Sequence, residues 1–314
     1  MRQPRIVIVG AGLVGGSAAL FAAVTAPGAE IVIVDVERVR AEAQALDLAH
    51  ATAFWGNDRV RAGDYEDARD ADIVVVTAGV GVKPGQTRLD LIQTNAGILY
   101  DIIDRTAPLA PEAIYVIASN PCDVLAALAQ ARLGCARERV ISTGTSLDTA
   151  RLRSLLSERL GVAAPAIEAY VLGEHGDSAL IHWSGASVAG LPMDLFLAQA
   201  GKDLGPASRS LLLRSVHEAA KLIKEGKSAT HYGIASGIAR ICQAIVHNSN
   251  QVLSVGIVQA EVEGVPEVCV SLPMLVNARG AQLLAYPRLE ESEREELQRS
   301  ARIVKDVTDS VAAR

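Results

Sequence analysis

The sequence predicts an α/β protein in which a doubly wound parallel sheet is followed by an α+β domain. Three observations support this prediction. Short β-branched runs alternate with helical stretches in the first half of the chain, and a glycine-rich turn follows the first run. After Gly144 this regular alternation gives way to longer helices and fewer strands. Alternating strands and helices are typical of a parallel sheet that carries helices on both faces. We therefore place one domain at residues 1–144 and a second at residues 145–314.

The first element is a strand over Arg5–Val9, and the pattern G-x-G-x-x-G follows it directly. A helix to about Thr25 and a second strand complete a strand–turn–helix–strand unit. In such a unit the first glycine permits a sharp turn, the second lets the backbone approach a pyrophosphate, and the third lets helix and strand pack closely. The unit predicts a Rossmann-type dinucleotide site whose loop residues are Gly10, Gly12, Leu13, Val14 and Gly15.

The second strand, Ile31–Val34, ends in Asp35, which lies 20 residues after the last glycine of the motif. This carboxylate would accept hydrogen bonds from both hydroxyls of the adenosine ribose and would repel a 2′-phosphate, so we expect NAD rather than NADP. By composition alone the uncharged run Ile6–Val24 resembles a signal peptide. A signal segment has no reason to end in a dinucleotide motif, and we therefore expect a cytoplasmic protein.

Further apolar runs predict the remaining strands of the sheet, because a strand buried on both faces needs no polar alternation. These expected strands are Asp72–Thr77, Ile114–Ala118 and Val140–Ser142. The expected helices between them are Val39–Ala51, Leu89–Thr106 and Val124–Leu133. The second half is predicted to form helices at Asp148–Leu160, Ala207–Glu225, Tyr232–His247 and from about Glu290, and strands at Val252–Val262 and Glu267–Leu272.

Charge and composition exclude several classes of protein. The chain has 30 basic and 36 acidic residues, a net charge of −6, and only 4% aromatic residues. This balance disfavours a surface for nucleic acid or anionic membrane, so we expect neither as a partner. No two of the four cysteines have C-x-x-C spacing and no histidine lies near them at the spacing of zinc ligands, so we expect no metal site.

Five segments in one order carry a more specific signal: Gly10–Gly15 with Asp35, Thr77–Leu91, Ser119–Asp123, Gly144–Arg151 and Gly173–Ser178. Together they resemble the L-lactate/malate dehydrogenase family, essentially end to end, and are closest to its NAD-dependent L-lactate branch. The resemblance implies hydride transfer between NAD(H) and a small L-2-hydroxy or 2-oxo acid, in a homotetramer or a homodimer. It also implies that Thr77, Ala78, Gly79 and Asn120 contact the cofactor.

The resemblance assigns roles to individual side chains of the second half. His175 matches the proton donor, and Asp148 matches the carboxylate that fixes the tautomer of the imidazole and stabilises its charged form. Arg151 lies three residues after Asp148, on the same face of a helix, and matches the clamp on the substrate carboxylate. Without the motif, the histidine would be an ordinary core residue and the Asp–Arg pair a surface ion pair.

Further roles fall on three loops. Arg88 matches the residue that polarises the substrate carbonyl, Asn120 a hydrogen-bonding residue between cofactor and substrate, and Thr230 a wall of the substrate pocket. A non-catalytic NAD sensor is the alternative class. It would have no reason to keep His175, Asp148, Arg151 and Arg88 together, so we expect an enzyme.

The chain departs from the family at Val82, where malate enzymes usually carry Arg and lactate enzymes usually Gln. Valine offers no donor, so closure over oxaloacetate would bury a second carboxylate without a partner. Malate is therefore disfavoured on physical grounds. We expect lactate and pyruvate as the substrate pair, with larger apolar acids such as 2-hydroxyisocaproate as the alternative.

A second departure concerns regulation. Many bacterial lactate enzymes bind fructose 1,6-bisphosphate through an Arg, matched here by Arg153, and a His, whose position is taken by Glu168. A carboxylate would repel a phosphate. We expect no activation by this sugar phosphate.

Overall fold

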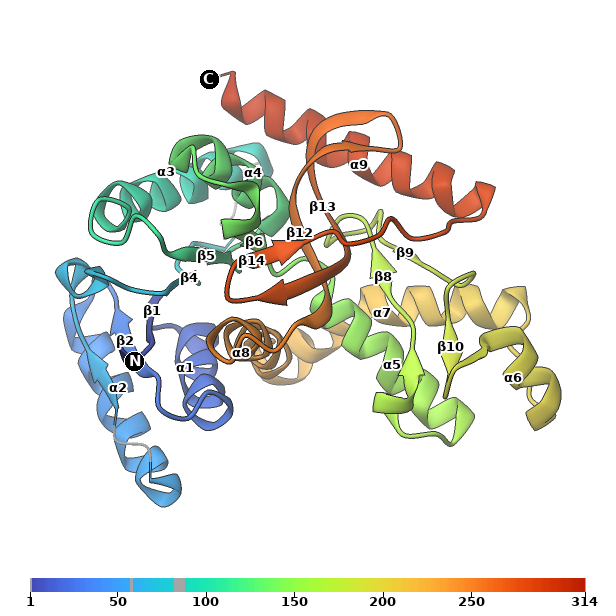
Figure 1. Ribbon diagram of the computed structural model, residues 1–314, viewed down its shortest axis with the longest axis horizontal. Helices are drawn as coiled ribbons and strands as arrows, with labels where there is room; N and C mark the ends of the chain where they lie inside the picture. The colour runs from blue at the N-terminus through green and yellow to red at the C-terminus, as the bar shows by residue number, and fades with distance from the viewer. Residues whose placement is uncertain (1, 57–58, 82–87, 314) are drawn as a thin grey trace.

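The computed structural model of the chain describes residues 2–56, 59–81 and 88–313, except for the side chain of Arg88. Its central feature is a nine-stranded sheet in the order β14-β13-β12-β6-β5-β4-β1-β2-β3 (Figure 1). The parallel strands are β1 (Arg5–Val9), β2 (Glu30–Val34), β3 (Val60–Ala62), β4 (Ile73–Val76), β5 (Ile114–Ile117) and β6 (Val140–Ser142). The antiparallel strands are β12 (Gln251–Val262), β13 (Val265–Asn277) and β14 (Gly280–Gln282).

The centre of the sheet is buried because its strands are runs of valine and isoleucine. Every residue of β4 and β5 is buried, as are the last four residues of β1 and of β2. β-Branched side chains pack well on a pleated surface, and helices on both faces cover both sets of side chains. The apolar runs thus produced the expected strands.

Helices lie on both faces of this sheet. One face carries α1 (Leu13–Thr25), α2 (Arg38–Thr52) and α8 (Tyr232–Val246), and the other carries α3 (Arg88–Thr106), α4 (Cys122–Leu133) and α9 (Glu291–Ala312) (Figure 1). Helix α8 packs against α1, and α9 packs against α4 and β13, so helices of the second half contact helices of the first. This arrangement holds the two halves of the chain together.

A second core lies beside the sheet, at the right of Figure 1, around α5 (Ser146–Leu160), α6 (Met193–Ala200) and α7 (Pro206–Lys227). Leu152, Leu156 and Leu160 line one buried face of α5 at four-residue spacing. The accompanying strands are β7 (Ile167–Glu168), β8 (Val171–Leu172), β9 (Leu180–Ile181), β10 (Ser187–Val188) and β11 (Leu191–Pro192). The short 3-10 helices are η1 (Ala53–Trp55), η2 (Tyr65–Ala68), η3 (Arg137–Arg139) and η4 (Ala164–Ala166).

The predicted fold class is confirmed: a doubly wound, mostly parallel sheet precedes an α/β region. One feature differs from the expectation of a sheet confined to the first half. Strand β12 pairs with β6 through Gly256 and Ser142, so the strands of the second half extend the first sheet. The domain boundary at residue 144 therefore stays a prediction, since one sheet continues across it.

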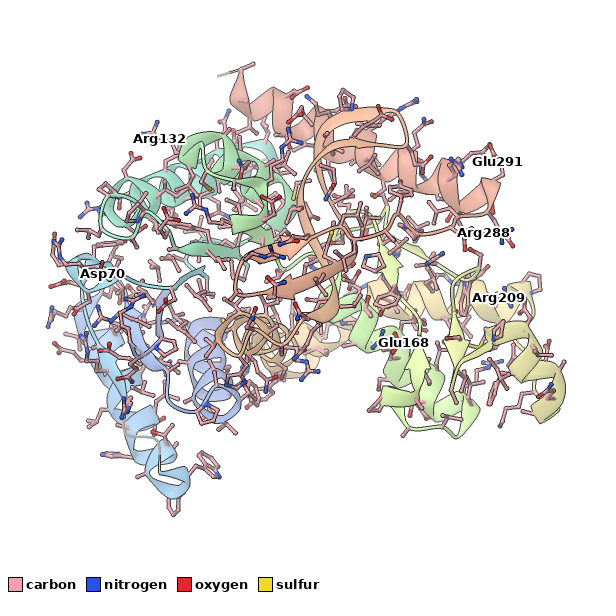
Figure 2. The ribbon with its side chains drawn as sticks, in the orientation of Figure 1. Asp70, Arg132, Glu168, Arg209, Arg288 and Glu291 are labelled. Carbon is pink, nitrogen blue, oxygen red and sulfur yellow. The ribbon has the colours of Figure 1, made fainter. Side chains whose placement is uncertain are left out.

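Several charged side chains lie at the periphery of the molecule. Arg132, Arg209 and Glu291 project outward at its edges in Figure 2. Within the described ranges, no helix has the length and the apolar character that a membrane span requires.

Candidate active site

The glycine-rich turn joins β1 to α1 at the carboxyl end of the sheet. Gly10 has a φ of +114°, which L side chains rarely adopt, and a Cβ on Gly15 would lie 1.8 Å from the carbonyl oxygen of Gly10. Gly12, by contrast, has no atom within 4 Å of its Cβ position, and no side chain caps the start of α1 there. Gly10 and Gly15 are therefore required by the backbone conformation and its close packing. Gly12 leaves open space at a helix N-terminus, which favours anions.

Asp35 lies beside this turn at the end of β2. Its Oδ2 accepts the amide N–H of Ala11 at 2.7 Å, and its Oδ1 accepts that of Glu37 at 2.9 Å. A cavity of about 620 Å³ is lined by Gly10, Gly12, Asp35, Tyr65 and the loop after β4, among other residues. The open space at Gly12, the uncapped helix and this carboxylate suit a dinucleotide diphosphate and an unphosphorylated ribose. The residues present therefore fit NAD.

The unequal roles of the glycines lead to a prediction. Gly15→Ala is expected to lower the free energy of unfolding by about 1–3 kcal/mol, because the new methyl group meets a backbone oxygen. Gly12→Ala is expected to leave thermal unfolding unchanged and to weaken NADH binding by about tenfold or more, since its methyl group points into the cavity. Calorimetry and NADH fluorescence titration separate the two effects; equal losses of stability would contradict this division.

The loops that follow β4 and β5 are tied together by a buried side chain, Asn95 of α3. Its Oδ1 accepts the amide of Val80 at 2.8 Å, and its Nδ2 donates to the carbonyl oxygens of Val80 at 3.2 Å and Asn120 at 2.9 Å. The hydroxyl of Ser119 donates to the carbonyl of Ala78 at 2.5 Å. Sequence reasoning missed Asn95. The signal was a polar residue within the apolar stripe of α3, whose buried neighbours include Ala96 and Leu99.

The catalytic candidates meet at the start of α5. Asp148 Oδ2 lies 2.6 Å from Nδ1 of His175, and Nη1 of Arg151 donates to Asp148 Oδ1 at 3.0 Å. The side chain of Asp148 is 6% exposed, that of Arg151 13% and that of His175 28%. Within the described part of the chain, Nε2 of His175 has no hydrogen-bond partner. The carboxylate thus holds both cationic groups, and the free imidazole nitrogen remains able to transfer a proton.

Electrostatics in this cluster favour a protonated imidazole. Burial disfavours the charged form, but the hydrogen bond to Asp148 and the charge of its carboxylate outweigh burial and raise the pKa of His175 above its ordinary value. Burial alone would raise the pKa of Asp148, yet the hydrogen bond from His175 and the charge of Arg151 lower it. Both pKa shifts favour the ion-paired form of the two side chains, which suits a group that donates a proton.

The other predicted residues lie at the edges of this region. Asn120 follows β5, with an exposed side chain and its backbone oxygen held by Asn95. Thr230 lies in the connection between α7 and α8, next to His231, whose Nδ1 lies 2.9 Å from the hydroxyl of Ser17 on α1. This contact ties the connection to the helix that follows the glycine turn.

Of the other predicted cofactor residues, Thr77, Ala78 and Gly79 line the cavity, whereas Leu13 and Val14 do not. Two predicted site groups cannot be placed. Leu13 and Val14 form the first turn of α1, and Thr77 donates to the carbonyl oxygen of Gly10 at 3.0 Å. Val82 and the side chain of Arg88 lie outside the described residues. In the described ranges, no group of three or more His, Cys, Asp or Glu side chains could hold a metal ion.

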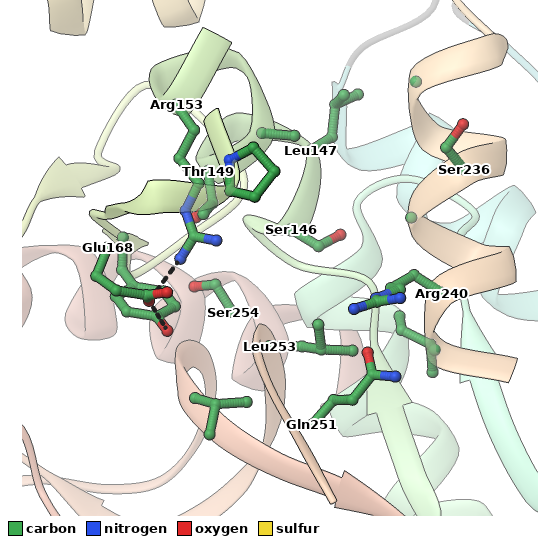
Figure 3. A pocket seen from close by; sticks show the side chains of 17 residues that line it. Ser146, Leu147, Thr149, Arg153, Glu168, Ser236, Arg240, Gln251, Leu253 and Ser254 are labelled. Carbon is green, nitrogen blue, oxygen red and sulfur yellow. Dashed lines mark hydrogen bonds and ion pairs between the residues drawn. The ribbon is translucent and has the colours of Figure 1, made fainter. Parts of the chain in front are cut away.

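A second cavity, of about 830 Å³, lies on another side of α5 (Figure 3). Neither His175 nor Asp148 nor Arg151 lines it, so it is separate from the candidate chemistry. At its edge Arg153 Nη2 lies 3.1 Å from Glu168 Oε2 (Figure 3). Tyr170 donates its hydroxyl proton to the same oxygen at 2.8 Å. Arg153 also lies over the Tyr170 ring, 4.8 Å from its centroid, so neighbouring side chains already engage its guanidinium.

Comparison with known proteins gives consistent matches over the whole chain. Residues 4–142 match the family of lactate/malate dehydrogenase NAD binding domains, and residues 145–314 match the lactate/malate dehydrogenase alpha/beta C-terminal domain. The first match confirms the prediction of an NAD-binding domain. An L-lactate dehydrogenase of Thermus aquaticus is 43% identical, with 98% of this chain and 99% of the relative covered. One of Geotalea daltonii is 44% identical, with the same coverage of both chains.

Solved structures agree with these matches. A lactate dehydrogenase from a Medee basin deep-sea metagenome library superimposes with a TM-score of 0.93 at 36% identity, covering 99% of this chain and 100% of that one. A minor L-lactate dehydrogenase from Enterococcus mundtii, solved in a ligand-bound form, gives 0.91 at 35% identity and 98% coverage of both chains.

Proposed function

The chain belongs to the lactate/malate dehydrogenase family, and from this premise we propose that it is an NAD-dependent L-lactate dehydrogenase. It interconverts pyruvate and L-lactate. The observation that carries this proposal is the contact of His175 and Arg151 with one buried carboxylate, Asp148, in a chain that also has a cavity suited to NAD. Relatives that share about 40% identity over the full length are L-lactate dehydrogenases.

The chain's own residues account for the proton and for substrate orientation. When held by the glycine-rich turn and Asp35, NADH would supply the hydride that the reduction of the carbonyl carbon requires. His175 gives the proton on Nε2 to the carbonyl oxygen, and Asp148 stabilises the imidazolium before that transfer. Arg151 has guanidinium N–H groups beyond the one that contacts Asp148, and these bind the substrate carboxylate as a two-pronged donor. In the reverse direction the neutral imidazole accepts the hydroxyl proton of lactate.

The remaining assignments complete the pocket. Arg88 polarises the carbonyl, Asn120 donates to its oxygen, and Thr230 and Val82 border the substrate side chain. An apolar group at position 82 accepts a methyl or a larger alkyl group and leaves a second carboxylate without a partner. We propose pyruvate as the main substrate, with larger apolar 2-oxo acids as the alternative.

A panel of substrates tests both the activity and this choice. With NADH, kcat/KM for pyruvate is expected to exceed that for oxaloacetate by about 10²-fold, since burial of an unpaired carboxylate costs several kcal/mol. Val82→Arg is expected to narrow this ratio, and Val82→Gln provides a neutral polar control. The panel includes 2-oxobutyrate and 2-oxoisocaproate, and NADPH in place of NADH.

The outcomes of the panel separate the alternatives. Fastest turnover of 2-oxoisocaproate would favour the enzyme for larger acids, and a preference for oxaloacetate would contradict the argument from Val82. NADH binding without turnover of any of these acids would favour the sensor.

Regulation by a sugar bisphosphate is expected to be absent. Arg153 is already paired with Glu168 and packed on Tyr170, and the Glu168 carboxylate would face an incoming phosphate. Addition of fructose 1,6-bisphosphate is therefore expected to leave KM for pyruvate unchanged, whereas Glu168→His is expected to introduce a response. A severalfold drop in KM of the native chain on addition would refute this prediction.

An assembly of identical chains accords with the surface of α2 and η1. Val39, Leu46, Phe54 and Trp55 are exposed along these two helices, which extend from the body at the lower left of Figure 1. Apolar side chains grouped in this way favour burial against another chain. We propose a homotetramer or a homodimer, and light scattering would measure which of the two forms. We also propose a cytoplasmic location.

A further inference from the structure

The buried carboxylate of Asp123 contacts the main chain of the proton donor, His175, and has no role in the mechanism above. Asp123 is the second residue of α4 and is 2% exposed. Its Oδ2 accepts the backbone N–H of His175 at 2.7 Å, and its Oδ1 accepts the hydroxyl proton of Ser142 at 2.7 Å. Sequence reasoning gave Asp123 no function, although it is the last residue of the segment Ser119–Asp123 that contributes to the family resemblance.

We propose that Asp123 is a positioning residue for the proton donor. It fixes the main chain of His175, whereas Asp148 fixes its imidazole ring. This inference rests on the proposed function, because it assigns Asp123 an effect on the same proton transfer.

The segment that carries His175 is held by hydrogen bonds from its backbone amides. Between β8 and β9 the chain has no regular secondary structure, and three consecutive amides donate to three different elements. Gly173 donates to the carbonyl of Ser271 on β13 at 3.0 Å, and Glu174 to the hydroxyl of Ser300 on α9 at 2.8 Å. The third amide, that of His175 itself, donates to Asp123 on α4. The position of the imidazole therefore depends on Asp123 more directly than on the other two partners.

Asp123 also lies close in the sequence to a loop that Asn95 ties to the cofactor cavity. Asp123 lies three residues after Asn120, whose carbonyl is held by Asn95 together with Val80 of the loop after β4. The loop after β4 is thus linked to the main chain of the proton donor through the hydrogen bonds of Asn95, the chain from Asn120 to Asp123, and the hydrogen bond of Asp123. This linkage couples the cofactor side of the site to the position from which the proton leaves.

The carboxylate of Asp123 is enclosed by neighbouring residues. Gly256 of β12 leaves room for it, since a Cβ there would lie 3.2 Å from Asp123 Oδ1 and 3.2 Å from the sulfur of Cys269. The titratable and charged groups that face it are the thiols of Cys122 and Cys269, the carboxylate of Glu174 and the imidazole of His175. Burial raises the pKa of Asp123 to about 6, against the hydrogen bonds from His175 and Ser142 that favour its ionised form. When ionised, Asp123 also favours the protonated form of His175.

The variants Asp123→Asn and Asp123→Ala separate the effect of the Asp123 charge from its effect on the main chain of His175. The Asn variant keeps an acceptor for the His175 amide and removes the charge, so the imidazole pKa, read by NMR titration and by the pH profile of kcat/KM for pyruvate, is expected to move down. The Ala variant also removes the acceptor, so kcat is expected to fall by about tenfold to a hundredfold with little change in KM, because Arg151 is not touched. Ser142→Ala is the matched control: it removes the other donor to Asp123, and its kcat and imidazole pKa are expected to stay close to native values.

The outcomes are distinguishable. Native kcat and an unchanged imidazole pKa in both folded variants would overturn the role of Asp123 and leave the proposed function intact. If Asp123→Ala does not fold, the Asn variant and its NMR titration decide alone. Absence of turnover in the native chain would overturn the proposed function, while the titration of His175 would still report the effect of Asp123.

Discussion

His175→Asn is expected to reduce pyruvate with a kcat about 10²–10⁴-fold below that of the native chain, while NADH binds with unchanged affinity. The loss follows from geometry. Nδ1 of the imidazole is engaged by Asp148, and Nε2 is the free atom that delivers the proton. The Asn side chain keeps a donor for Asp148, so the buried carboxylate retains a partner, but it has no proton to give near neutral pH.

Steady-state kinetics and NADH fluorescence titration measure the two quantities separately. His50→Asn makes the same chemical change at an exposed position of α2 and is expected to leave kcat unchanged. Retention of native kcat by the His175 variant would remove His175 from its proposed role and require a different proton source.

Local patterns were sufficient for the sheet and for the residues that share a helix. Strands β4 and β5 are buried on both faces, and their runs of mostly valine and isoleucine predict this burial. Asp148 and Arg151 lie one turn apart on α5, so their contact follows from helical spacing. The family resemblance supplied the pairing of His175 with Asp148, which local spacing could not.

Contacts between distant segments were beyond what spacing could predict. Asp123 and His175 are 52 residues apart in the sequence, and their contact depends on how α4 faces the β8–β9 connection. Asn95 was missed for a similar reason, because its partners Val80 and Asn120 lie in two loops that only the folded sheet brings together. The two-residue strands β7 to β11 carry too few residues for a periodic pattern.

Asp148→Asn is expected to lower kcat/KM for pyruvate by about 10²-fold or more near neutral pH and to move its pH profile to lower values. The Asp148 carboxylate makes the largest contribution that raises the pKa of His175 against the effect of burial, so its neutral replacement leaves less imidazolium at any given pH. Pyruvate reduction needs that imidazolium. The loss in kcat/KM is therefore expected to shrink as the pH is lowered, and a loss independent of pH would contradict this account.

The same substitution is expected to change stability in a defined pH window. The pKa of Asp148 is lowered in the folded chain, so its stabilising effect is present above its unfolded pKa, about 4, and disappears as the pH falls through the folded value. The pKa of His175 is raised, so its effect is present below about pH 6.5 and disappears as the pH rises through the folded value. Native and variant chains should differ most in free energy of unfolding between about pH 4 and pH 6.5, by about 1.5–3 kcal/mol.

Denaturant unfolding at a series of pH values tests this window. Glu37→Gln is a matched control, because it removes a carboxylate from an exposed ion pair with Arg40 at the same three-residue spacing. Exposed pairs contribute about 0–1 kcal/mol, so the control is expected to show a small and nearly flat difference. If Asp148→Asn behaved like Glu37→Gln, the buried carboxylate would not stabilise the charged imidazole, and the ion pair proposed as the source of the transferred proton would have to be abandoned.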